Sequence, residues 1–96
     1  MIGFEWDSDK ACANFAKHGV SFEDAALVWD DPLHLLRFDR LEGGEERWHI
    51  LGMVGGTMLL LVAHTYLWSE RDDAARIISA RKATRSERRV YEEGDF

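Results

Sequence analysis

The chain has 96 residues, of which 46% are hydrophobic and 31% are charged, and its net charge is −6. This composition fits one globular domain and excludes a disordered chain. The lone cysteine, Cys12, excludes an intramolecular disulfide, and the longest apolar run, from Met58 to Ala63, is too short to span a membrane. The first residues also lack the basic and apolar regions of a signal peptide. We therefore expect a single cytoplasmic domain over residues 1–96, without membrane contact.

The first third of the chain predicts one strand and two helices. Gly3–Trp6 alternates and predicts a short strand, and Lys10–His18 predicts a helix that ends at Gly19. An aspartate before this helix can cap its first turn. Ser21 is placed to cap a second helix, which stops at Asp30-Asp31-Pro32.

The first helix is predicted to be amphipathic. Its expected buried side consists of Ala11, Cys12, Phe15 and Ala16, and its polar side consists of Lys10, Asn14, Lys17 and His18. In this arrangement Cys12 is a small buried side chain rather than a reactive thiol.

The remainder predicts four strands and a final helix. The expected strands are Leu33–Phe38, Arg47–Val54, Thr57–Tyr66 and Ala75–Arg81, and the connections between them are Asp39–Glu45, Gly55-Gly56 and Leu67–Ala74. The two glycines predict a tight hairpin, and Thr84 with Glu87 predicts a capping box at the start of the last helix. The order β-α-α-β-β-β-β-α predicts an α+β domain. Its two N-terminal helices pack on one face of an antiparallel sheet, and a short C-terminal helix follows.

Positive charge is concentrated near the C-terminus. From Arg71 to Arg89 there are seven Arg/Lys against three Asp/Glu, whereas residues 1–70 carry five against twelve. Such an asymmetry indicates an anionic partner or substrate. The sequence contains no phosphate-binding glycine loop, no nucleophile elbow and no zinc-ligand spacing, so arginines carry the candidate chemistry.

Several of these polar residues have predicted positions. Arg76 is expected to project to the open face of the sheet, and Ile77, Ser79 and Arg81 share the other parity of their strand. His64 and Tyr66 share parity with Met58, Leu60 and Val62, whereas Arg47 and His49 alternate with Trp48 and Ile50, as on a half-solvated sheet. In the last helix, Arg85, Arg88 and Tyr91 share one side. Such a set can bind phosphate and transfer protons, but its helical arginines also fit a self-paired surface, and His64 also fits an edge histidine.

Two spaced motifs, one near each end of the chain, resemble the BrnT family. The first is Phe4-Glu5-Trp6-Asp7-x-x-Lys10-x-x-x-Asn14-x-x-Lys17-His18-Gly19-Val20-x-Phe22-x-x-Ala25, and the second is Arg76-Ile77-Ile78-Ser79-Ala80-Arg81-x-Ala83-x-x-x-Glu87-Arg88-x-x-Tyr91. Between them, Asp30-Asp31-Pro32, Arg47 and Gly55-Gly56 also fall where such a protein has them. The resemblance covers nearly the whole chain.

The resemblance implies a RelE-like fold and the toxin half of a type II toxin–antitoxin system. The implied activity is a metal-independent RNA endonuclease, without cofactor, that arrests translation on free or ribosome-associated RNA. The implied partner is BrnA, a ribbon-helix-helix antitoxin that neutralises the toxin and through which the toxin contacts DNA indirectly.

On this resemblance, each candidate residue receives an expected role. Arg76 and Arg81 stabilise the phosphate with support from Arg88, His64 and Tyr91 transfer protons, and Lys17, His18, Arg47 and Arg85 contact the substrate. The alternatives are a non-catalytic module that binds a protein or a nucleic acid, and a C-terminus whose arginines are only surface charge.

Overall fold

The computed structural model describes residues 2–67 and 73–96, and within them it contains five strands, three α-helices and one 3₁₀ turn. The elements are β1 (Gly3–Glu5), α1 (Ser8–His18), α2 (Phe22–Ala26), η1 (Leu27–Asp30), β2 (Leu35–Glu42), β3 (Glu45–Val54), β4 (Met58–Leu67), β5 (Ala74–Lys82) and α3 (Arg85–Glu93). Most of the predicted loop Leu67–Ala74 lies outside the described residues. No described helix is both long and apolar enough to cross a membrane.

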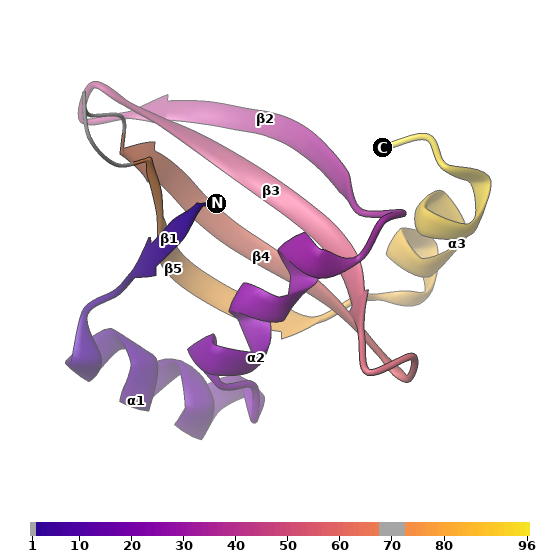
Figure 1. Cartoon of the computed structure of the whole chain (residues 1–96), viewed down its shortest axis with the longest axis horizontal. Helices are drawn as coiled ribbons and strands as arrows, with labels where there is room; N and C mark the ends of the chain where they lie inside the picture. Colours follow the sequence, from indigo (N-terminus) through magenta and orange to yellow (C-terminus); the bar gives the residue numbers. More distant parts are fainter. Residues whose placement is uncertain (1, 68–72) are drawn as a thin grey trace.

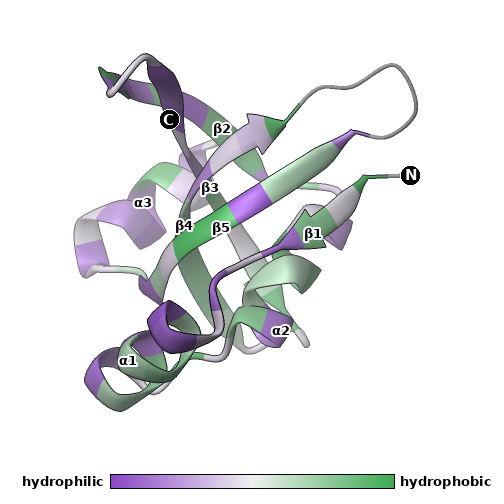
Figure 2. Ribbon diagram, turned by 90° about the vertical axis from the view of Figure 1, so that its left-hand side faces the viewer, coloured by the Kyte–Doolittle hydropathy of each residue, from purple (hydrophilic) through white to green (hydrophobic). Residues whose placement is uncertain are grey.

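The strands form one sheet in the order β1-β5-β4-β3-β2 (Figure 1). The predicted α+β class is confirmed, but the sheet is mixed, because β1 pairs with β5 in parallel while the other pairs are antiparallel. Helices α1 and α2 lie on one side, and α3 lies apart from them, near the end of β5 (Figure 2). We use "open face" for the face of the sheet opposite α1 and α2.

Glycine pairs make the turns between β2 and β3 and between β3 and β4. Gly55 and Gly56 have φ of 63° and 72°, values that suit the tight turn predicted there. The other turn is shorter than predicted, because β2 continues to Glu42 and only Gly43-Gly44 separates it from β3. Three of residues 39–42 are charged, as suits an exposed edge strand, and these charges resemble those of a loop in the sequence.

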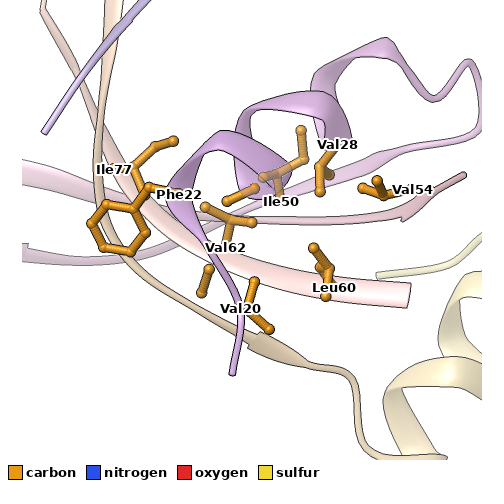
Figure 3. Packing of buried hydrophobic residues seen from close by; sticks show 10 residues of the cluster. Val20, Phe22, Val28, Ile50, Val54, Leu60, Val62 and Ile77 are labelled. Atoms are coloured by element: carbon orange, nitrogen blue, oxygen red, sulfur yellow. The ribbon is translucent and has the colours of Figure 1, made fainter. Parts of the chain in front are cut away.

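The main core lies between the sheet and the two N-terminal helices (Figure 3). It is built from alternate residues of the central strands and from apolar side chains of α2 and its surroundings, namely Val20, Phe22, Ala25, Val28, Ile50, Val54, Leu60, Val62, Ile77 and Ala80. Gly52 lets η1 approach the sheet closely, since a Cβ there would lie 2.7 Å from Val28 Cγ1. A second, smaller cluster under α3 contains Leu51, Leu59 and Leu61, with Val90 and Tyr91 packed against it.

The predicted faces of α1 are wrong. Asn14 is only 7% exposed, whereas Phe15 is 57% exposed and Cys12 is also exposed. The reason is that β1 pairs with β5 only as far as Arg76, so none of the described strands lies beside the edge of β5 beyond that point. The Asn14 side chain fills this place, and therefore a polar residue, not an apolar one, faces the sheet.

The Asn14 amide makes three hydrogen bonds. Its Nδ2 donates to the carbonyls of Ala80 (2.9 Å) and Val20 (3.1 Å), and its Oδ1 accepts from the Ala80 N–H (3.1 Å). The amide therefore pairs with Ala80 as the backbone of a neighbouring strand would. This contact fixes the segment of β5 that leads directly into Arg81.

Candidate active site on the open face of the sheet

Strand register places a group of basic residues together on the open face. Arg81 pairs with Leu61 and Leu61 with Leu51, a residue of the cluster under α3. Residues in register share a face, and side chains alternate along each strand. The basic residues on the same face are thus Arg37 and Arg40 on β2, Arg47 and His49 on β3, and Arg76 and Arg81 on β5.

A β-bulge changes the predicted parity of β5. Ala63 pairs with Ser79, but His64 pairs with Ile77, so Ile78 is an extra residue in β5. The prediction that Arg81 and Ile77 share a face opposite Arg76 is therefore wrong. Arg76 and Arg81 both reach the open face, on either side of the bulge.

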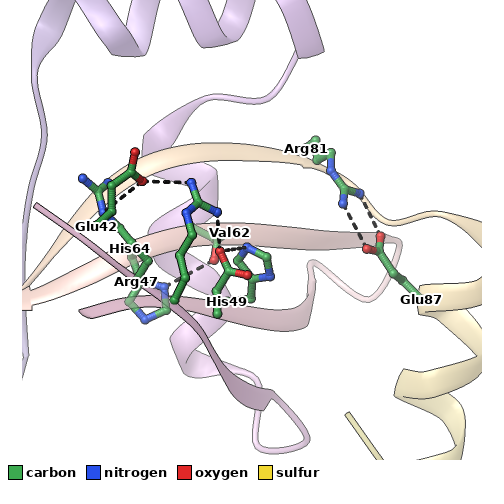
Figure 4. A network of polar contacts seen from close by, with 9 residues as sticks. Glu42, Arg47, His49, Val62, His64, Arg81 and Glu87 are labelled. Carbon is green, nitrogen blue, oxygen red and sulfur yellow. Dashed lines mark hydrogen bonds and ion pairs between the residues drawn. The ribbon is translucent and has the colours of Figure 1, made fainter. Parts of the chain in front are cut away.

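Arg81 is held by Glu87 of α3 (Figure 4). The guanidinium donates from Nη1 (2.8 Å) and Nη2 (3.0 Å) to the two carboxylate oxygens of Glu87. The bond from Arg81 is the main reason that the pKa of Glu87 falls to about 2. Glu87 also accepts from Thr84 N (2.9 Å), which completes the predicted capping box. The first turn of α3 therefore orients Arg81 over the sheet.

His49 lies within this group of charges. Its Nε2 is 3.7 Å from Asp39 Oδ2, and its side chain is 20% exposed. Burial lowers the pKa of His49 below 6.5, Arg37 and Arg81 lower it further, and Asp39 and Glu87 oppose the shift. Its Nδ1 is buried and has no hydrogen-bond partner within residues 2–67 and 73–96. The lowered pKa favours the neutral form of His49, which is the form that can accept a proton.

The sequence alone does not single out His49 as a proton-transfer group. The available signal is its parity with Arg47, two residues earlier in the same strand. The pairing of His49 with Arg37, however, appears only once the register of β2 and β3 is known. Arg37 itself lies over the ring of Phe96, with its Cζ 4.2 Å from the ring centroid.

Arg47 and Arg76 flank the group at its edges. Arg47 makes long ion pairs, with Nε 3.9 Å from Glu42 and Nη2 3.8 Å from Glu45. Arg76 is 48% exposed and donates from Nε (3.0 Å) and Nη2 (2.9 Å) to Glu5 of β1. Both predicted phosphate or substrate contacts therefore lie on the same face as Arg81.

His64, predicted to transfer protons, lies in the core. It is fully buried on the side of the helices, with its ring 4.7 Å from that of Trp29 and 4.8 Å from that of Tyr66. Burial lowers the pKa of His64 to about 4. The structure does not bring His64 to the open face, so we assign it no contact with substrate.

Tyr91, the other predicted proton carrier, ties α3 to the rest of the chain. Its hydroxyl donates to Asp31 Oδ2 (2.6 Å), and burial together with this bond raises the pKa of Tyr91 to about 12. Asp31 also accepts from the N–H groups of Met53 (2.8 Å) and Leu33 (2.9 Å). This geometry gives Tyr91 a structural role, because its hydroxyl proton is already donated in the hydrogen bond to Asp31.

The other predicted substrate contacts lie around this face. Arg85 and Arg88 are exposed on α3. Lys17 and His18 line a groove between α1 and β5, together with Ser79. Within the described part of the chain, no group of three or more His, Cys, Asp or Glu residues is placed to hold a metal ion.

The arrangement can bind a phosphate and move a proton. Comparison with known proteins agrees with this chemistry. Residues 6–87 match the family described as "Ribonuclease toxin, BrnT, of type II toxin-antitoxin system". The fold is similar to the crystal structure of the Brucella abortus ribonuclease toxin BrnT, with a TM-score of 0.63 and 24% identity over 88% of this chain and 100% of that chain. No curated protein matches the sequence. Because the family match spans most of the chain, this protein belongs to the BrnT family of ribonuclease toxins of type II toxin–antitoxin systems.

Proposed function

We propose that this protein cleaves RNA on the open face of its sheet, without a metal ion, and thereby arrests translation in the cytoplasm. The observation that carries the proposal is that Arg81, fixed by Glu87, and His49 lie on the same open face of the sheet. A cation held in place and a nearby proton acceptor are the groups that RNA cleavage through the ribose 2′-hydroxyl requires.

The proposed reaction is an in-line displacement at phosphorus. His49 takes the proton of the 2′-hydroxyl, the O2′–P bond forms, and the P–O5′ bond breaks. Solvent water supplies the proton that the departing 5′ oxygen takes up. Arg81 stabilises the charge that develops on the phosphoryl oxygens, and Asp39, 3.7 Å from His49, stabilises the imidazolium.

The other arginines receive supporting roles in this proposal. Arg76 and Arg47 bind phosphates beside the cleaved linkage, since register puts them on the same face as Arg81. Arg85 and Arg88, exposed on α3, contact the RNA where it leaves the surface of the sheet. His64 and Tyr91 support the fold and do not transfer protons.

The family also supports a protein antitoxin as the partner. We propose that it is a ribbon-helix-helix protein similar to BrnA, that it neutralises the toxin, and that it mediates the contact with DNA. The net charge of −6 disfavours tight binding of free RNA, so we also propose that the substrate is presented by the ribosome.

The test is cleavage of bacterial RNA and of ribosome-bound mRNA by purified protein, with a metal chelator present. Arg81→Ala is expected to reduce the rate by about 10²–10³, the usual effect of removing one charge-stabilising group. Arg89→Ala, which removes an exposed arginine elsewhere on α3, is the matched control and is expected to retain wild-type activity.

His49 is tested by the pH dependence of the same reaction. The rate is expected to fall in the acid range, where the imidazole becomes protonated although burial lowers its pKa, and His49→Ala is expected to remove this acid limb. Wild-type protein that binds RNA but never cleaves it would instead support the non-catalytic alternative.

A further inference from the structure

A second basic surface adjoins the candidate active site at the edge of β5. A groove of about 240 Å³ separates α1 from this strand. It is lined by Lys10, Ala13, Asn14, Lys17 and His18 of α1 and by Ile78 and Ser79 of β5. Its titratable side chains are two lysines and a histidine, and no carboxylate lines it.

The groove is continuous with the open face. Ser79 pairs with Ala63 as Arg81 pairs with Leu61, so Ser79 and Arg81 project from the same face of β5. Their Cα atoms are separated by two strand residues, about 6.6 Å, which is comparable with the spacing of successive phosphates in a single strand. Ser79 therefore belongs both to the row that carries Arg81 and to the wall of the groove.

The edge of β5 at Ile78 and Ser79 is open to the groove, beside the Asn14 side chain that pairs with Ala80. β1 accompanies β5 only along Ala74–Arg76, and no other described strand pairs with this edge beyond that point. In Figure 2, β5 runs between α3 and α1, the helices that border the open face and the groove. A flexible polymer bound over Arg81 can thus continue around the edge towards α1.

The charges of the groove are not explained by the helix alone. Lys17 and His18 lie in the last turn of α1, where a cation is favoured by the helix dipole. Lys10 lies in the first turn, where the dipole disfavours a cation. Glu5 and Asp7 lie near Lys10 in the adjoining pocket, whereas a negatively charged ligand in the groove would interact with all three cations.

We infer that this groove binds a backbone phosphate of the RNA that flanks the cleaved linkage, through Lys10, Lys17 and His18. Ser79 offers a hydroxyl donor on the path from Arg81. The inference rests on the proposed RNA cleavage and adds the route of the substrate. Because lysines bind phosphate as point charges, the groove raises affinity without reading sequence.

The test is binding of a single-stranded 2′-O-methyl RNA of about 12 nucleotides, which is long enough to cross both surfaces and has no 2′-hydroxyl to react. Fluorescence anisotropy gives its Kd at several salt concentrations. Lys10→Ala/Lys17→Ala is compared with wild type and with Arg89→Ala, a loss of exposed charge outside the groove. Far-ultraviolet circular dichroism of each variant shows whether α1 is intact.

The double variant is expected to bind the 2′-O-methyl RNA more weakly. The slope of the logarithm of its binding constant against the logarithm of salt concentration is expected to decrease in magnitude by about 0.7 for each phosphate that the groove no longer binds. Its KM for a long substrate rises with kcat unchanged, while its kcat/KM for a dinucleotide, too short to reach α1, equals that of wild type. Arg89→Ala is expected to keep the wild-type slope.

Two results overturn the inference in distinguishable ways. If the double variant binds and cleaves long RNA like Arg89→Ala while Arg81→Ala slows cleavage by about 10²–10³, the groove is not a phosphate site, but the proposed function stands. If folded wild-type protein neither binds nor cleaves RNA, free or on the ribosome, both proposals fail together.

Discussion

Asn14→Ala is expected to destabilise the fold more than its position on a surface helix suggests. The substitution removes the three hydrogen bonds that the amide makes with Ala80 and Val20. It leaves the N–H and the carbonyl of Ala80 without partners at the edge of β5. The affected strand segment immediately precedes Arg81, so the cleavage rate is expected to fall as well.

The magnitude follows from the number and burial of these bonds. A buried hydrogen bond contributes about 1 kcal/mol net, so the loss of all three lowers the free energy of unfolding by about 3 kcal/mol. Domains of this size have total stabilities of roughly 5–15 kcal/mol, and each kcal/mol moves the Tm by about 4–8 °C. We therefore expect the Tm to fall by about 12–24 °C.

Urea unfolding followed by tryptophan fluorescence measures this effect. Asn14→Asp distinguishes the effect of lost hydrogen bonds from the effect of lost side-chain volume, because it keeps the shape of the side chain. It places a carboxylate oxygen against two carbonyl oxygens. At pH 7 it is therefore expected to be at least as destabilising as Asn14→Ala. Phe15→Ala, on the exposed side of the same helix, is the control and is expected to change little. An unfolding free energy of Asn14→Ala within about 0.5 kcal/mol of wild type would refute the role assigned to the amide.

Three further predictions concern packing and pH. Gly52→Ala is expected to cost about 1–3 kcal/mol, measured by urea unfolding, because the new Cβ would lie 2.7 Å from Val28 Cγ1. The pKa of His64 is lowered from 6.5 to about 4, so wild type is expected to lose up to about 3 kcal/mol as the pH falls through that window. His64→Leu removes this loss, and an unchanged pH profile of unfolding would contradict the assignment. The pKa of Glu87 is lowered from 4.5 to about 2, so Glu87→Gln is expected to lower the free energy of unfolding above pH 4.5. This destabilisation is expected to disappear as the pH falls towards 2. A difference in unfolding free energy between variant and wild type that does not change with pH would argue against the bond to Arg81.

Local sequence signals predicted most of the elements because each acts over a few residues. The hairpin at Gly55-Gly56 and the capping box at Thr84 depend only on immediate neighbours, and both are confirmed. The buried side of α1 could not be predicted in this way. Asn14 is buried because β1 is too short to accompany β5, a fact about two segments more than sixty residues apart.

In the candidate site, too, local motifs could be read from the sequence, whereas contacts between distant segments could not. Arg81 and Arg76 could be selected from their motif, but the bulge at Ile78 that turns both to the open face depends on pairing with β4. The sequence pointed to His64 rather than His49, although the parity of His64 with Leu60 and Val62 already places it among core residues. Which histidine meets solvent is decided by the side of the sheet that the helices cover, and this is a tertiary property.

The proposed phosphate site of this ribonuclease toxin lies on the open face of the sheet and is centred on Arg81. Its most direct test is induced expression in a bacterial host, with growth and total-RNA integrity followed for wild type beside Arg81→Ala. Wild type is expected to show growth arrest and RNA loss, and an Arg81→Ala protein present at the same level is expected to show neither. Equal arrest and RNA loss in both would contradict the site, and a folded wild-type protein that leaves growth and RNA intact would contradict the function.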